Sequence, residues 1–141
     1  MENTVPGLAI LIVDDDPIVR RLLALSLRSG GCITYEATDV TEALKVLVLA
    51  GWTAIIVDLD MPGADGEEFV LRARNRGYDG LILVLSSDAQ AKGRCARLGV
   101  PLVQKPFNPD ELLQRIVESV GAGVRRERPI GIPARKQAHV S

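Results

Sequence analysis

The chain is poor in the residue types that build several common kinds of site. Its 141 residues include two cysteines, one histidine, one tryptophan, two tyrosines and two phenylalanines. Cys32 and Cys95 belong to no CxxC motif and no Cys/His cluster, which argues against a zinc site. His139 lies near the end of the chain, away from every other candidate group. We expect both cysteines to be buried free thiols in a reducing cytoplasm.

The sequence also lacks a strong charge of one sign and a long apolar run. A formal net charge of -1 does not suit a protein that coats nucleic acid or an anionic membrane. No stretch approaches the roughly 20 apolar residues that span a bilayer, and residues 1–7 do not resemble a signal peptide. We therefore expect a cytoplasmic protein. With 47% hydrophobic residues, the chain has enough apolar material for one compact domain.

Short apolar runs alternate along the chain with segments of helical periodicity. Ile18, Leu22 and Leu25, for example, recur at helical spacing after Asp16-Pro17, a good N-cap and first helical residue. Buried strands that alternate with helices predict a parallel sheet covered on both faces. We predict a flavodoxin-like, doubly wound α/β fold with strand order 2-1-3-4-5. Its strands are expected at residues 8–13, 33–36, 54–57, 81–85 and 100–103.

The composition changes near the end of the chain. Residues 1–121 are predicted to form the domain, and residues 122–141 a flexible basic tail rich in glycine, proline and arginine. The tail could equally be a linker cut from a longer protein. Nucleic-acid contact by the tail is the less favoured alternative, because its few cations are not interleaved with aromatic residues.

Polar side chains follow four of the predicted strands. Asp14-Asp15-Asp16 follow the first strand, Asp58 and Asp60 the third, Ser86-Ser87 the fourth, and Lys105 the fifth. Parallel strands end at one edge of the sheet, so these groups are expected in one shallow pocket. Two carboxylates about 5 Å apart repel by roughly 3 kcal/mol at an effective dielectric of 20. Either some of their pKa values rise, or a hard divalent cation lies among them.

Asp58 is the best candidate for a nucleophile in this pocket. A carboxylate with an ordinary pKa is already ionised at neutral pH and needs no base. Its place directly after an apolar strand holds it rigidly while exposing its oxygens. Lys105 and Ser86 would stabilise charge on a transferring phosphoryl group, and the product would be a reactive acyl phosphate.

Four motifs together resemble the response-regulator receiver domains, the CheY-like domains of bacterial two-component signalling. The resemblance covers residues 8–120, and the motifs are ILIVDDDP at 10–17, IIVDLDMPG at 55–63 with Asp65-Gly66, Ser86-Ser87, and KPF at 105–107. It implies that Asp58 is the phosphoacceptor. It also implies a Mg²⁺ or Mn²⁺ ion held by Asp14, Asp15, Asp58 and the main-chain carbonyl of Asp60.

The resemblance assigns roles to three further positions. Ser86 corresponds to the hydroxyl residue that moves toward the phosphoryl group on activation, and Lys105 to the lysine that binds this group, with a cis bond to Pro106. Asp60 and Asp88 occupy positions that tune the lifetime of the phosphoryl group, and we expect them to influence water access. Leu102 departs from the family, which often has Tyr or Phe there. Coupling is therefore expected to run mainly through Ser86 and the loop after it.

The implied function is a phosphorylation-controlled switch. A sensor histidine kinase or phosphotransfer protein would donate the phosphoryl group, and the chain would catalyse only its own phosphorylation and dephosphorylation, so it is not a conventional enzyme. The fourth helix, fifth strand and fifth helix would present a changed surface to an unidentified protein target. Whether the chain also forms a homodimer through that surface stays open.

Two other functions are weighed against the switch. Asp58-Leu59-Asp60 resembles the DxD motif of haloacid-dehalogenase-type phosphatases, but Pro62 replaces their usual Thr or Val. Their motif also opens the first strand, whereas this one follows the third. The other alternative is a degenerate receiver that serves only as an interaction module. The presence of every expected acceptor and metal-binding group argues against it.

Overall fold

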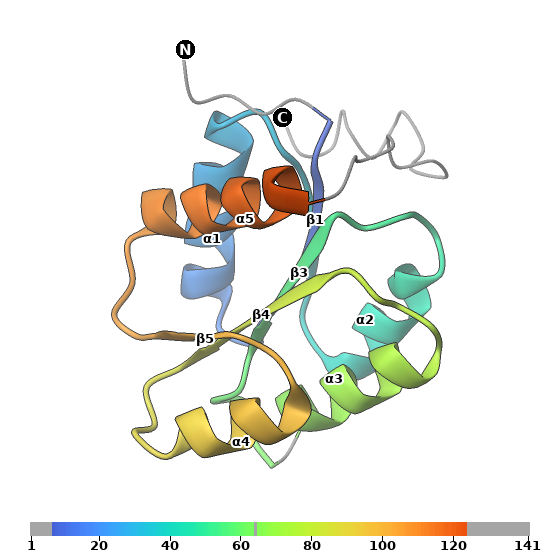
Figure 1. Cartoon of the computed structure of the whole chain (residues 1–141), viewed down its shortest axis with the longest axis vertical. Helices are drawn as coiled ribbons and strands as arrows, with labels where there is room; N and C mark the ends of the chain where they lie inside the picture. The colour runs from blue at the N-terminus through green and yellow to red at the C-terminus, as the bar shows by residue number, and fades with distance from the viewer. Residues whose placement is uncertain (1–6, 64, 124–141) are drawn as a thin grey trace.

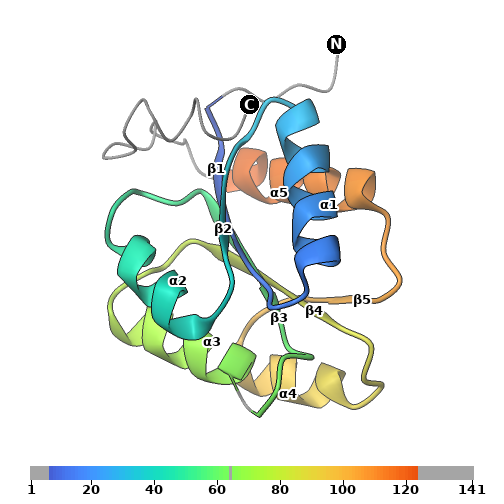
Figure 2. The same cartoon turned by 180° about the vertical axis from the view of Figure 1, so that it is seen from behind.

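The protein forms a five-stranded parallel sheet with helices on both faces. The computed structural model describes residues 7–63 and 65–123, and Figures 1 and 2 show it from opposite sides. The strand order is β2-β1-β3-β4-β5, which confirms the predicted flavodoxin-like topology. The elements in chain order are β1 (Ala9–Val13), α1 (Pro17–Ser29), β2 (Ile33–Ala37), α2 (Val40–Leu47), β3 (Ala54–Asp58), α3 (Asp65–Asn75), β4 (Leu81–Ser86), α4 (Ala91–Leu98), β5 (Leu102–Gln104) and α5 (Pro109–Gly123).

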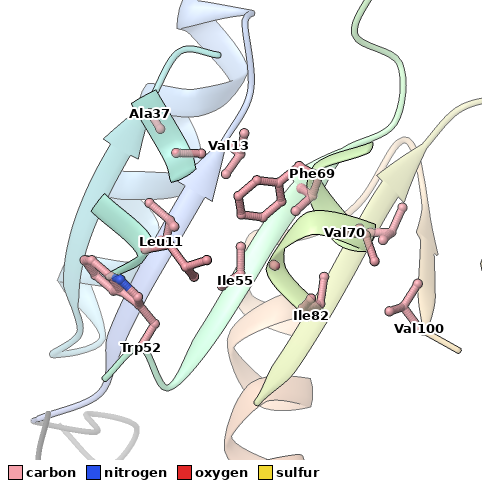
Figure 3. Close-up of a cluster of buried hydrophobic side chains, with 14 of the residues drawn as sticks. Leu11, Val13, Ala37, Trp52, Ile55, Phe69, Val70, Ile82 and Val100 are labelled. Carbon is pink, nitrogen blue, oxygen red and sulfur yellow. The ribbon is translucent and has the colours of Figure 1, made fainter. Parts of the chain in front are cut away.

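The alternation of side chains along the central strands builds two apolar layers. Leu11 and Val13 of β1 point toward α2, α3 and α4, where they join a cluster centred on Phe69, which Figure 3 shows in close-up. Ile10 and Ile12 belong to a second cluster on the opposite face of the sheet, which α1 and α5 cover (Figure 1). Both faces of β1 and β3 are buried along their whole length, which explains their unbroken apolar sequence.

Helix α1 begins and ends where the sequence predicts. The side chain of Asp16 accepts hydrogen bonds from the main-chain N–H groups of Ile18 and Val19, so it caps the helix, and Gly30 follows the last helical residue. The predicted apolar stripe of α1 does not face the core, however, because Ile18 is 78% exposed and Leu22 is 49% exposed.

The last third of the chain differs from the prediction in its boundaries. Strand β5 begins at Leu102 rather than at residue 100, and α4 begins at Ala91. Helix α5 continues to Gly123, two residues past the expected end of the domain, since a glycine weakens a helix without forbidding it. The rest of the expected basic tail, residues 124–141, lies outside the described residues.

Two further expectations concern the cysteines and the absence of membrane-spanning segments. Cys32 and Cys95 are both buried and free, as predicted. None of the helices within residues 7–63 and 65–123 is long and apolar enough to cross a membrane.

Candidate functional site

Two neighbouring strands bring three carboxylates together. Asp14 directly follows β1, Asp58 is the last residue of β3, and the two strands pair in register through Val13 and Val57. Carboxylate oxygens of Asp14, Asp15 and Asp58 lie within 4.8 Å of one another. Adjacent parallel strands that end at one edge therefore create the acidic cluster that the sequence predicts.

The buried member of this cluster has an oxygen that no hydrogen bond satisfies. Asp14 is 1% exposed, and its Oδ1 accepts a hydrogen bond from the main-chain N–H of Asp16 at 2.9 Å. Its Oδ2 is buried and has no hydrogen-bond partner among residues 7–63 and 65–123. Burial, together with the nearby charge of Asp58, raises the pKa of Asp14 to about 7. A buried carboxylate oxygen facing other carboxylates is the environment that a hard cation with oxygen ligands would relieve, so the donor set fits Mg²⁺ or Mn²⁺.

Lys105 provides the positive charge opposite the acidic cluster. Its Nζ donates to Oδ1 of Asp58 at 3.0 Å, and the same oxygen accepts from the main-chain N–H of Asp60 at 2.9 Å. Burial alone would lower the pKa of Lys105, but its hydrogen bonds with Asp58 and Asp60 and their charges outweigh this effect and raise the pKa. The main-chain N–H of Lys105 donates to the main-chain carbonyl oxygen of Ser86 at 2.9 Å, which joins the end of β5 to β4. The bond between Lys105 and Pro106 is cis, as predicted.

The side chain of Asp60 makes contacts that sequence reasoning did not foresee. Its Oδ1 accepts from the Ser86 hydroxyl at 2.7 Å, and its Oδ2 accepts from the main-chain N–H and the hydroxyl of Ser87, each at 2.9 Å. Lys105 Nζ lies 3.2 Å from the same Oδ2. Burial would raise the pKa of Asp60, but these hydrogen bonds hold it below its usual range. The resemblance implies for Asp60 only a main-chain carbonyl ligand to the metal ion and an influence on water access to the phosphoryl group.

Two further residues support the loops of the site. Arg20 of α1 donates through its Nη1 to the main-chain carbonyl of Asp14 at 2.8 Å, and no motif in the sequence indicates this role. Gly66 at the start of α3 lies against the loop after β3, because a Cβ atom there would be 2.5 Å from the carbonyl oxygen of Asp58. Close packing therefore requires a glycine at position 66, which belongs to the motif quoted after the third strand.

The position that departs from the receiver-domain pattern, Leu102, borders a cavity whose lining residues include none of these carboxylates. Leu102 is partly buried and borders an open cavity of about 360 Å³ between α4 and β5. The cavity is lined by Lys92, Cys95, Ala96, Val100, Leu102 and Gln104. A leucine has no hydroxyl, so the side chain at position 102 cannot make the hydrogen bond by which a tyrosine there could connect the acidic site to the surface.

Comparison with known proteins agrees with this geometry. Residues 10–117 match the model of the response regulator receiver domain. The response regulator MprA of Mycobacterium leprae is 37% identical over 123 residues, which are 85% of this chain and 52% of the relative. The chain thus spans about half the length of the curated relatives it matches.

Solved structures of receiver domains have the same fold. The chemotaxis protein CheY4 of Vibrio cholerae is 32% identical, with a TM-score of 0.71 over 77% of this chain and 95% of that one. The response regulator TrrA of Thermotoga maritima, solved in complex with Mg²⁺ and beryllofluoride, is 30% identical, with a TM-score of 0.71 over 79% of this chain and 97% of that one.

Proposed function

Because the chain belongs to the response regulator receiver domain family, we propose that Asp58 accepts a phosphoryl group from a sensor histidine kinase or a phosphotransfer protein. The observation that carries the proposal is the position of Asp58 between the Lys105 ammonium, 3.0 Å away, and the carboxylates of Asp14 and Asp15. Positive charge on one side and a cation-binding cluster on the other suit the charge that develops on a transferring phosphoryl group.

The proposed step uses groups that this chain supplies. An oxygen of Asp58 attacks the phosphorus of a phosphohistidine; the O–P bond forms as the N–P bond breaks, and the imidazole leaves with the electron pair of that bond. Lys105 and Ser86 donate hydrogen bonds to the phosphoryl oxygens. Hydrolysis resets the switch: water attacks the phosphorus, the Asp58 carboxylate leaves, and inorganic phosphate is released. The chain thus catalyses only its own phosphorylation and dephosphorylation.

Mg²⁺ or Mn²⁺ completes the proposed site. Asp14, Asp15, Asp58 and the main-chain carbonyl of Asp60 would hold the ion. When bound, it would neutralise negative charge on the phosphoryl oxygens. The unsatisfied buried Oδ2 of Asp14 supports this assignment, as does the presence of Mg²⁺ and beryllofluoride in the complex of the related TrrA.

The proposed output is a change in the surface formed by α4, β5 and α5. The loop after Ser86 leads directly into α4, so movement of Ser86 toward a phosphoryl group would be transmitted to that surface. A protein target is proposed to bind there in the cytoplasm, and a second copy of the chain is the other candidate for the same surface.

Incubation with acetyl phosphate and Mg²⁺ tests the proposal. Intact-mass spectrometry should show the gain of one phosphoryl group, which chelation of the metal should abolish. Asp58→Asn should not gain mass. Asp65→Asn, which changes an exposed carboxylate at the start of α3, should gain mass like the wild type. Equal labelling of Asp58→Asn would contradict the proposal. No labelling, together with no spectral response to beryllofluoride, would favour a module that only binds other proteins.

A further inference from the structure

The carboxylate of Asp60 is the acceptor for three kinds of donor at the rim of the site. A hydroxyl from Ser86, a main-chain N–H and a hydroxyl from Ser87, and the ammonium of Lys105 all reach it within 2.7 to 3.2 Å. Ser86 and Ser87 come from the end of β4 and the loop after it, and Lys105 directly follows β5. One anionic side chain therefore joins three segments of the sheet edge.

These donors are the groups that a phosphoryl group on Asp58 would need. A phosphoryl group adds nearly two negative charges and three acceptor oxygens. Lys105 already contacts both Asp58 and Asp60. Ser86 has a single hydroxyl proton, which it gives to Asp60, while its oxygen accepts from the main-chain N–H of Asp88 at 3.0 Å. The Ser86 proton cannot serve Asp60 and a phosphoryl oxygen at the same time.

Resting on the function proposed above, we propose that the Asp60 carboxylate is an internal acceptor that holds Ser86, Ser87 and Lys105 in the unphosphorylated chain, and that the phosphoryl group displaces it. In the unphosphorylated chain Lys105 lies between two singly charged carboxylates. A phosphoryl group on Asp58 would place nearly two negative charges beside the Asp60 carboxylate at the same ammonium, and this stronger repulsion favours the departure of Asp60. The Asp60 side chain is 26% exposed and can turn toward water when it loses its partners. Its departure frees the loop that leads into α4, which supplies a route for coupling where Leu102 replaces an aromatic residue.

Beryllofluoride titration at saturating Mg²⁺ tests the internal acceptor directly. Asn has nearly the shape of Asp but lacks its charge and its second acceptor oxygen. Removal of a charged acceptor should tighten beryllofluoride binding by about tenfold in Asp60→Asn, with Asp60→Ala binding at least as tightly. The main-chain amide signals of Ser86 and Ser87 in NMR spectra should move in the variants before any beryllofluoride is added.

Asp65→Asn is the matched control, since it removes one carboxylate that has no hydrogen bond to these donors among the described residues. Its beryllofluoride affinity should equal that of the wild type. The Mg²⁺ affinity of each variant is measured first, without beryllofluoride, so that every titration is made at saturation. Unchanged or weaker binding by Asp60→Asn would overturn the internal acceptor while leaving Asp58 as the acceptor of the phosphoryl group. A wild-type chain that binds no beryllofluoride would overturn both proposals.

Discussion

Arg20 connects the acidic loop after β1 to the second strand. Its guanidinium donates to the main-chain carbonyl of Asp14 at 2.8 Å and to the Glu36 side chain at 3.1 Å, and its own side chain is only 14% exposed. Arg21, the next residue, also pairs with Glu36, at 3.5 Å, but it is 60% exposed. Two adjacent arginines thus share one acidic partner, and of these two it is Arg20 that contacts the loop carrying the proposed metal ligands.

We expect Arg20→Met to lower the free energy of unfolding by about 1–3 kcal/mol, because it leaves partly buried hydrogen-bond acceptors without their donor. The same change should weaken Mg²⁺ binding by about tenfold, as loss of a residue that orients a metal ligand does elsewhere. Arg21→Met should lower the free energy of unfolding by no more than about 0.5 kcal/mol. Urea unfolding and Mg²⁺ titration provide the two measurements, and equal effects of the two variants would contradict the assignment.

The difference between predicted and unpredicted site residues has a physical cause. Asp58 and Lys105 are found from the sequence because Asp58 ends a buried strand and Lys105 directly follows another strand, and a parallel sheet sends all such positions to one edge. Asp14 was found in the same way. The contacts of Asp60 and Arg20 depend on loop conformation and on where a long side chain ends, and no periodic pattern carries that information.

At the scale of elements, α1 shows how an apolar sequence can indicate a helix without indicating its buried face. Leu23 and Leu27 are fully buried against β1 and α5, whereas Leu22 and Leu25 are 49% and 54% exposed. Leucines occupy adjacent turns on both faces, so the spacing of apolar residues fits more than one orientation. The boundaries were predictable because the Asp16 cap and Gly30 mark them independently of the apolar pattern.

Leu22 and Leu23 form a matched pair for a test of this orientation. Leu23→Ala should lower the free energy of unfolding by about 2–5 kcal/mol, since it leaves a cavity in the layer between α1 and the sheet. Leu22→Ala should lower it by no more than about 1 kcal/mol, because about half of this residue is already exposed to water. Chemical denaturation of both variants under the same conditions is the measurement. A larger loss in Leu22→Ala would mean that the opposite face of α1 is packed.

Helix α4 begins only at Ala91, five residues after the end of β4, because side chains bind the main chain of the intervening loop. Asp88 donates its N–H to the Ser86 hydroxyl, and its carboxylate accepts from the N–H of Gln90 at 2.9 Å. Such side-chain bonds favour a turn over a helix. No side chain caps the start of α4 at Gln90. The element was thus predictable, while its first turn depends on the same loop that contacts Asp60.

At the scale of the whole molecule, the sheet divides the core into two layers that do not mix. Cys32 lies in the layer beneath α1 and α5, and Cys95 in the layer beneath α2, α3 and α4. The topology followed from the sequence because buried parallel strands with helical connections allow few arrangements. The same separation means that a disulfide between the two thiols cannot form without unfolding of the sheet.

The buried thiol of Cys32 gives the free energy of unfolding a dependence on alkaline pH. Burial raises the pKa of Cys32 from 9.0 to about 11. In the unfolded chain the thiol loses its proton near its ordinary pKa, whereas in the folded chain it keeps the proton until about pH 11. Between these pH values the unfolded state therefore binds fewer protons than the folded state. The contribution of Cys32 to stability is fully present below pH 9 and is lost as the pH rises to 11.

We expect Cys32→Ala to flatten this alkaline loss. At about 1.4 kcal/mol for each pH unit, the wild type should lose up to about 3 kcal/mol more than the variant between pH 9 and pH 11. Lysines and tyrosines also titrate in this range, but they do so in both proteins, so the difference between the two pH profiles isolates Cys32. Urea unfolding at several pH values provides the profiles. Parallel profiles would show that the thiol reaches solvent in the folded protein, contrary to its place in the layer beneath α1 and α5.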